Sequence, residues 1–435
     1  MCVPYMLIMW KIIPETTGKT LEEIEKYWTR QTSHNMKSSF LENIDGKNAT
    51  LKQKILSLCI NEGYHSIAEL SQEINTSIPT TTKLVEELIN DGFIEDRGKI
   101  DTSGGRRPSI YGLNASAGYL IGIDIRKNSV CVAIADFKGD ILEYYKDIKL
   151  TVESSEQSFR TLCSMIKDHM KQTMIPMEKI MAVGVNLSGR VNSVTGYCFS
   201  YFIGDDRPVS TIFEEEFGCP IYVENDSRAM TYGEYIAGVG NNEETMLFIN
   251  LTWGLGMGMI IDGKLSYGKS GFSGEIGHFP MLNNNIICHC GKTGCLETGA
   301  SGQAAQRILI EKLQEGRASI LKEKFDRQEE ILIEDILNAV NEEDVLTIEV
   351  MEEIGSVLGR AIAGLINIFN PELVVIGGHL SEAKEYLMLP LKTSVYKHSL
   401  NMINKDTTIK LSKLAEKAGA IGACMLSRSK LLGLI

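Results

Sequence analysis

Three cysteines within eight residues constrain this chain more than any other stretch of its sequence. Cys288, Cys290 and Cys295 are interspersed with glycines that permit tight backbone turns, and His278 lies ten residues upstream. Thiolate sulfur and neutral imidazole are ligands that zinc prefers, and a closed set of four such ligands is typical of a structural site. The pattern therefore predicts a tetrahedral zinc site made by His278, Cys288, Cys290 and Cys295.

Two alternatives concern the same stretch. His289 is a spare candidate ligand, but its place between two ligands predicts that its side chain points away. Buried or disulfide-bonded cysteines would also explain the cluster, although closely spaced thiols with two glycines and a histidine favour a metal. The other seven cysteines are scattered without a framework, as expected in a reducing cytosol.

The stretch resembles the signature of the ROK family, which contains sugar-responsive repressors and sugar kinases. The resemblance rests on Gly-Glu-x-Gly-His at 274–278 and on Cys-x-Cys-Gly-x-x-Gly-Cys-x-Glu at 288–297. It implies that the histidine and the three cysteines hold zinc. It also implies that Glu275, Glu297 and the free edge of the His278 ring line a sugar pocket.

The size and charge of the chain limit the remaining possibilities. A chain of 435 residues is too long for one compact core, so two or three domains are expected. A net charge of −12 argues against a general nucleic-acid coat but is compatible with a small DNA-reading module. The apolar segment 2–13 is too short to span a bilayer and lacks the marks of a signal peptide. We therefore expect a cytoplasmic protein without a membrane partner.

A DNA-binding domain is predicted at 48–113, after an N-terminal extension (1–47) of uncertain role. Ser66 and Glu69 form a capping box at the start of one short helix, and a second helix is expected at about 78–90. Two short helices joined by a tight turn are typical of the helix-turn-helix motif. The exposed start of the second helix is predicted to contact DNA through Thr80, Thr81, Thr82 and Lys83.

A β-hairpin is expected to follow these helices. Its tip carries Arg106 and Arg107, which suit phosphate or minor-groove contact. With the helices it resembles the winged helix-turn-helix of the repressor branch of the ROK family. Residues 48–113 contain 7 Lys/Arg against 9 Asp/Glu, a net charge of −2, so DNA binding would be local and salt-sensitive. A winged helix used only for protein contact is the alternative.

Residues 117–435 alternate between strand and helix patterns. Their order, a β-hairpin, a helix and a further strand, resembles the lobe of actin-like ATPases, which have a ribonuclease H-like α/β fold. The resemblance implies a two-lobed sugar-binding domain. Lobe 1 would span about 117–235 together with a C-terminal helix at 419–435, and lobe 2 would span about 245–418.

The nucleotide side of this domain departs from the pattern of the family's kinases. In those enzymes glycines after the first strand let the backbone approach phosphate. Here Arg126 and Lys127 stand in the place of glycines, and Asn128 replaces a threonine. Two long side chains would fill the space of a phosphate tail, and Trp253 is bulky at the entrance of the loop 252–258. The departures predict a protein that is not an enzyme.

The sugar side keeps more of the family pattern. Ser188 and Gly189 lie in a loop that resembles the Pro-Gly-x-Val-Asp loop of the family. Asn225 and Asp226 end a predicted strand, where the kinases place an asparagine that binds the sugar ring and an aspartate that acts as base. Without a phosphoryl donor Asp226 would be a vestigial base that binds hydroxyls, although it could instead cap a helix. The predicted ligand contacts are Ser188, Gly189, Asn225, Asp226, Glu275, His278 and Glu297.

These features predict a sugar-responsive transcriptional regulator, most simply a repressor that binds operator DNA as a homodimer or homotetramer. A sugar or sugar derivative between the lobes would change the spacing of the DNA-reading heads, and zinc would orient His278 and Glu297. One alternative is an ATP-dependent, glucokinase-like sugar kinase with a regulatory N-terminal domain. Another is a sugar-sensing scaffold that contacts protein.

Overall fold

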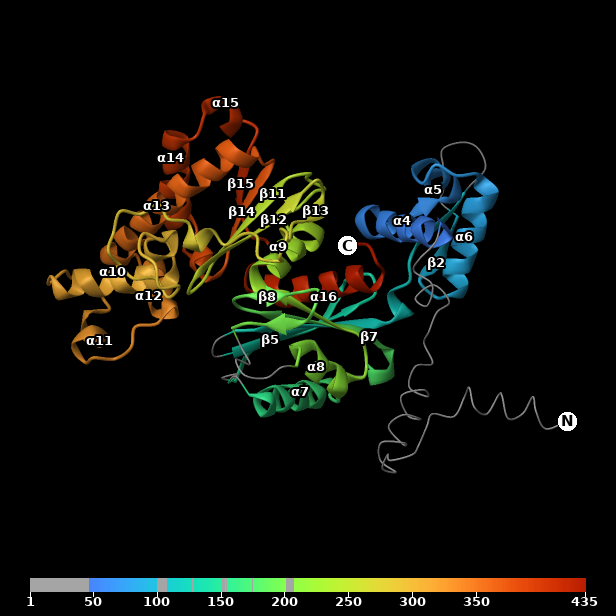
Figure 1. Cartoon of the computed structure of the whole chain (residues 1–435), viewed down its shortest axis with the longest axis horizontal. Coiled ribbons are helices and arrows are strands. Elements are labelled where there is room, and N and C mark those ends of the chain that lie inside the picture. Colours follow the sequence, from blue (N-terminus) through green and yellow to red (C-terminus); the bar gives the residue numbers. More distant parts are fainter. Residues whose placement is uncertain are drawn as a thin grey trace.

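The computed structural model describes residues 47–99, 108–126, 129–150, 153, 155–173, 175–200 and 207–435. The predicted extension before Lys47 lies outside the described residues, as do the wing-tip residues Arg106 and Arg107. Lys127 and Asn128 also fall outside them. Figure 1 shows a small head built by the first part of the chain and two larger lobes built by the rest.

The head is a winged helix. Its elements are α4 (Lys47–Glu62), β1 (His65–Ser66), α5 (Ile67–Glu73), α6 (Ile78–Asn90), β2 (Ile94–Lys99) and β3 (Ser109–Leu113). The strands form an antiparallel sheet in the order β1-β3-β2, so the predicted hairpin is confirmed. The capping box is also present, because Ser66 N donates to Glu69 Oε2 at 2.7 Å and Glu69 N donates to Ser66 Oγ at 3.3 Å.

Lobe 1 is built on a five-stranded sheet in the order β10-β7-β4-β5-β6. Alternate residues of its strands point to opposite faces, and the face that carries Ile121, Ile123 and Ile125 packs against α7 and α8. The elements are η1 (Ala115–Ala117), β4 (Tyr119–Ile125), β5 (Ser129–Asp136), β6 (Ile141–Lys149), α7 (Glu156–Met170), η2 (Met177–Lys179), β7 (Ile180–Leu187), β8 (Val191–Asn192), β9 (Tyr197–Cys198), α8 (Val209–Phe217), β10 (Ile221–Asn225) and α9 (Asp226–Ala237).

Lobe 2 repeats this plan with a sheet in the order β13-β12-β11-β14-β15. Its outer face packs against α10, α12, α13 and α14 in the largest apolar core of the described chain. The elements are β11 (Met246–Leu251), β12 (Leu255–Ile261), β13 (Lys264–Leu265), η3 (Ile276–His278), η4 (Leu296–Thr298), α10 (Gly302–Gln314), α11 (Lys322–Asp326), α12 (Ile333–Asn341), α13 (Val345–Phe369), β14 (Leu373–Gly377), η5 (His379–Ala383), α14 (Glu385–His398), α15 (Asn401–Asn404), β15 (Thr408–Leu411) and η6 (Ala415–Lys417).

The last helix, α16 (Ala418–Leu431), lies with α9 between the two sheets (Figure 1). Glycines on lobe 1 permit this close approach. A Cβ added to Gly122 would lie 1.9 Å from the carbonyl oxygen of Ala420, and one added to Gly184 would lie 2.2 Å from that of Ala423. The C-terminal helix thus packs on the sheet of the first lobe.

The head packs directly on lobe 1. The ring of Phe93, in the head, lies 5.3 Å from the ring of Phe137, in the turn after β5. Leu432, just beyond α16, is fully buried in the same apolar cluster as the head helices. The residue that follows α16 thus belongs to the core of the head. None of the helices in the described part of the chain is long and apolar enough to cross a membrane.

Candidate functional site

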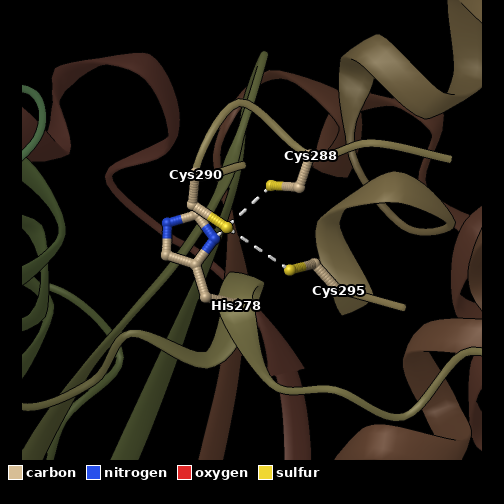
Figure 2. A group of neighbouring side chains, drawn as sticks. All are labelled: His278, Cys288, Cys290 and Cys295. Atoms are coloured by element: carbon tan, nitrogen blue, oxygen red, sulfur yellow. Dashed lines mark hydrogen bonds between the residues drawn. The ribbon is translucent and has the colours of Figure 1, made fainter. Parts of the chain in front are cut away.

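The predicted metal ligands converge at one point of lobe 2 (Figure 2). Cys290 Sγ lies 3.6 Å from Cys295 Sγ, and Cys288 Sγ lies 3.6 Å from His278 Nδ1. The four ligand atoms all lie within 4.8 Å of one another. A tetrahedral zinc ion with bonds of about 2.0–2.3 Å separates its ligand atoms by roughly 3.5–3.8 Å. The cluster can therefore hold a metal ion of that size.

The local backbone explains why these side chains meet. Gly291 and Gly294 adopt positive φ values of 82° and 77°, which other residues rarely tolerate. The turn is closed by two main-chain hydrogen bonds of 2.8 Å between Cys288 and its neighbours Gly291 and Lys292. The three cysteines are free thiols, and the 3.6 Å between Cys290 and Cys295 far exceeds a disulfide bond. The disulfide alternative is thus wrong.

The two ring nitrogens of His278 face different parts of the site. Its Nδ1 points toward the cysteines, while Nε2 points toward the cleft and lies 3.9 Å from Glu275 Oε2. An imidazole that gives Nδ1 to a metal keeps a proton on Nε2, which can then donate a hydrogen bond. The His278 side chain thus lies between the three cysteines and the cavity described below.

His289 does not behave as the sequence predicted. Instead of pointing away from the site, its Nδ1 lies 2.8 Å from Glu297 Oε1 and 3.8 Å from Cys288 Sγ. The other carboxylate oxygen of Glu297 accepts a hydrogen bond of 3.0 Å from the Leu255 amide. His289 therefore fixes a predicted ligand residue, and together with His278 and Glu297 it forms a second group of donors that could hold a metal.

The His-Cys cluster borders, through His278, a cavity of about 490 Å³ between the lobes. Lobe 1 contributes residues from the ends of β7 and β10, and lobe 2 contributes the loops around η3 and η4. All seven predicted ligand residues line this cavity: Ser188, Gly189, Asn225 and Asp226 on lobe 1, and Glu275, His278 and Glu297 on lobe 2. The structure thus brings them together, while their contact with a ligand remains a prediction.

Asp226 is held by its neighbours at the floor of the cavity. Its Oδ2 accepts from Ser188 Oγ at 2.9 Å, and its Oδ1 accepts from Ser227 N at 2.7 Å. Removal from bulk water raises the pKa of Asp226, and the nearby charge of Asp124 raises that pKa further. The helix N-cap is Asn225, whose side chain accepts from Arg228 N, so the alternative of Asp226 as N-cap is wrong.

Asn250 is a cavity residue that the sequence analysis missed. It is the second-last residue of β11, is only 2% exposed and donates from Nδ2 to Ser227 Oγ at 3.1 Å. Its Oδ1 has no hydrogen-bond partner among the described residues. Because a buried acceptor without a partner is costly, this oxygen is suited to a ligand hydroxyl. A polar residue in the apolar run of β11 is the signal that could have identified it.

Arg126 directly follows β4 and lines the cavity between the lobes. Its Nε donates to Asp124 Oδ2 at 2.9 Å, and its Nη2 donates to the carbonyl oxygen of Glu416 at 2.7 Å. Arg126 lines the same cavity as Asp226, and so does Trp253. Arg126 therefore lies in the cavity, while the exclusion of a phosphate tail by its side chain stays a prediction.

The start of α6 differs from the prediction at one residue. Thr80 and Lys83 are exposed and Thr82 is half-buried, but Thr81 is fully buried. Thr81 bonds to Thr76 Oγ1 at 2.8 Å and lies on the face of the helix that packs into the head. The prediction that Thr81 contacts DNA is therefore wrong, because it requires an exposed hydroxyl.

A winged-helix head and a two-lobed actin-like body with a cysteine cluster beside its cleft define the class of this protein. Comparison with known proteins agrees: residues 120–430 match the ROK family, and residues 49–95 match winged helix-turn-helix DNA-binding domains. The chain belongs to the ROK family.

The most similar proteins include regulators and kinases. The xylose repressor of Caldicellulosiruptor bescii is 27% identical over 397 residues, which cover 89% of this chain and 98% of that protein. The glucokinase of Halalkalibacterium halodurans is 30% identical, but the match covers 72% of this chain and 96% of the enzyme. A ROK family transcriptional regulator, described as a homologue of the Escherichia coli MLC protein, has a TM-score of 0.76 at 26% identity, covering 89% and 98% of the two chains.

These matches separate the two predicted functions. The repressor and the regulator align with the head as well as the body, whereas the match to the glucokinase leaves more than a quarter of the chain uncovered. Together with the winged helix, they identify a sugar-responsive transcriptional repressor and not a sugar kinase.

Proposed function

We propose that the protein is a cytoplasmic repressor controlled by a neutral, unphosphorylated sugar bound between its lobes. The observation that supports this ligand class is the charge of the cavity. Arg126 is the one Lys or Arg side chain among the described residues that line it, and its guanidinium is already engaged by Asp124 and Glu416. The lining carboxylates are Asp124, Asp226, Glu275, Glu297, Glu330, Glu334, Glu382 and Glu416.

This charge distribution selects against phosphorylated ligands. A phosphate would lose its water while facing several carboxylates and no free cation, which is the repulsive part of specificity. Sugar hydroxyls, in contrast, donate readily to carboxylates such as Glu297 and Asp226 and accept from the Nε2 proton of His278. Asn250 Oδ1 would accept one further hydroxyl proton. The site is thus proposed for xylose-like or glucose-like sugars.

The proposed metal is zinc, held by His278, Cys288, Cys290 and Cys295. When bound, zinc supplies a rigid cross-link between the loops around η3 and η4. The residues of the chain then act on the ligand: His278 presents Nε2 to the cavity, and Glu297 is held by His289 and the Leu255 amide. Both side chains would be ordered before the sugar arrives, which lowers the entropic cost of binding.

DNA would be bound by the head of each protomer in a homodimer or homotetramer. Thr80, Thr82 and Lys83 are proposed to meet the major groove, and Arg106 and Arg107 to meet the backbone or the minor groove. Sugar binding would close the cleft and change the separation of the two heads. A half-site separation that no longer matches the operator releases the DNA.

A thermal-shift titration tests the ligand class. The panel is D-xylose, D-glucose, N-acetyl-D-glucosamine and D-glucose 6-phosphate, with the non-hydrolysable ATP analogue AMPPNP in a parallel series. A neutral sugar at 100 times its Kd should stabilise the protein by about 2.7 kcal/mol, whereas the phosphate and AMPPNP should cause no shift. The same sugar should release a DNA duplex selected from a random library. Binding of AMPPNP together with sugar phosphorylation would refute the proposal.

A further inference from the structure

Arg126 contacts two further residues in addition to Asp124 and Glu416. Besides Asp124 and the carbonyl of Glu416, its Nη1 lies 3.4 Å from His379 Nε2 and 3.5 Å from Asp147 Oδ1. The side chain is 17% exposed. One guanidinium therefore meets four partners on four different segments of the chain.

These partners belong to parts of the protein that move separately if the cleft opens. Asp124 and Asp147 are on strands of lobe 1. His379 begins η5, directly after β14 of lobe 2. Glu416 is in η6, the connection between β15 of lobe 2 and α16. Arg126 therefore joins both lobes and the connection between them.

The chemistry of the pair with His379 is fixed by the guanidinium. Because arginine only donates, His379 Nε2 must accept and the ring must be neutral. Burial lowers the pKa of His379, and the positive charge of Arg126 lowers it further, which favours this neutral form. A planar fork with five N–H groups can serve all these acceptors at once, whereas a lysine ammonium cannot span them.

Asp124 holds the guanidinium of Arg126 in place on lobe 1. Its carboxylate is 1% exposed and sits against the first turn of α16, because a Cβ added to Gly419 would lie 2.4 Å from it. The pair with Arg126 is therefore held on one side by lobe 1 and α16. Movement of lobe 2 would break only the contact with His379 and disturb the one with Glu416.

We propose that Arg126 is a latch between the lobes, a positioning residue that holds the cleft near its closed geometry without a nucleotide. In a nucleotide-free sensor, this lets a sugar alone complete the closure. The first part of the proposal, the latch, concerns the free protein. The second part, that the latch raises sugar affinity, rests on the proposed function.

Hydrogen exchange of the free, full-length protein tests the latch. The variants are Arg126→Lys, which keeps the charge that Asp124 needs, and His379→Ala, which leaves the Asp124 pair intact. Both should speed amide exchange at 378–384 and 412–420 at least about fivefold. Arg327→Ala is the matched control, since Arg327 is an exposed arginine that pairs only within its own region. It should leave these rates unchanged.

Sugar affinity is then measured for the same proteins with whichever of D-xylose, D-glucose or N-acetyl-D-glucosamine binds the wild type. Arg126→Lys and His379→Ala should each weaken binding about five- to tenfold, and the double variant should be no weaker than the worse single one. Additive losses would overturn a shared latch.

The outcomes separate the latch from the proposed function. Wild-type exchange rates in both single variants would overturn the latch and leave Arg126 as a counter-ion for Asp124. Faster exchange with unchanged sugar affinity would overturn the second part alone. Faster exchange in a protein that binds none of the neutral sugars would support the latch and refute the proposed function.

Discussion

Lys430 Nζ of α16 lies 3.1 Å from Glu224 Oε2, and this ion pair ties the helix that enters the DNA-binding head to the strand that ends in Asn225. Glu224 is 1% exposed and also binds Arg228 at 2.7 Å. Burial alone would raise the pKa of Glu224, but Lys430 and Arg228 outweigh this effect and lower it. Two residues beyond Lys430, Leu432 is buried among the head helices. The pair thus connects the strand that leads to the cavity residue Asn225 with the helix that leads to the head.

Lys430→Met should weaken the response to sugar more than it weakens DNA binding. The methionine preserves most of the side-chain volume, and Glu224 keeps Arg228 as its partner, so we expect a stability loss of about 1–2 kcal/mol. Fluorescence anisotropy with a selected DNA duplex, with and without sugar, measures the response. Lys417→Met, at the other end of α16, is the control. Full sugar-induced release by Lys430→Met would show that α16 does not carry the signal through this pair.

Loss of the proposed zinc should damage the cavity and spare the head. Wild-type protein is expected to carry one zinc per chain by mass spectrometry, and Cys290→Ser should lower that content and weaken sugar binding about tenfold or more, since His278 and Glu297 lose their support. DNA affinity without sugar should stay near the wild-type value, because the cluster lies in lobe 2. Cys219→Ser, a free thiol outside the cluster, should behave as wild type. Unchanged sugar affinity and stability in Cys290→Ser would contradict the bracing role.

Local sequence signals predicted much of the fold. The helix at 78–90 and the capping box at Ser66 depend on short-range periodicity and caps, and both are present as expected. The convergence of His278, Cys288, Cys290 and Cys295 was equally predictable, because glycine-rich turns bring residues close in sequence together in space. Features of this kind require no knowledge of how distant segments pack.

The errors and omissions concern side-chain contacts and not the course of the backbone. Thr81 is polar and near the start of α6, yet the orientation of the helix against the head buries it. His289 turns toward Glu297, and the contacts of Arg126 with His379 and Glu416 join positions more than 250 residues apart. Periodicity along one segment does not encode such partners. The contacts of Arg126 with His379 and Glu416 depend on how lobe 1 packs against the segments that follow it.

Asp226→Asn should stabilise the protein while it abolishes sugar binding. A carboxyl with a raised pKa binds protons more readily folded than unfolded, so its contribution to stability falls as pH rises from its usual value of 3.8 through the folded pKa. At pH values above the folded pKa, the buried charge of Asp226 lowers the free energy of unfolding by a constant amount. Asparagine removes the cost, so the variant should be more stable than the wild type at pH 8, with a smaller gain toward acidic pH. Urea unfolding at several pH values measures this, and a less stable variant at pH 8 would contradict the prediction.

Substitutions of the neighbouring residues Thr80 and Thr81 in α6 should have different effects, one on DNA affinity and the other on stability. Thr81→Ala removes a buried hydroxyl that bonds to Thr76 and should destabilise the head by about 1–2 kcal/mol, with DNA binding altered only through unfolding. Thr80→Ala should keep stability and lower DNA affinity, because Thr80 is exposed.

Lys83→Ala should weaken binding to all sequences and reduce the salt slope by about 1, and the Arg106→Ala, Arg107→Ala pair should reduce it by about 2. Anisotropy over a range of salt concentrations reads these slopes. If the winged helix contacted only protein, neither the wild type nor any variant would show salt-dependent DNA binding.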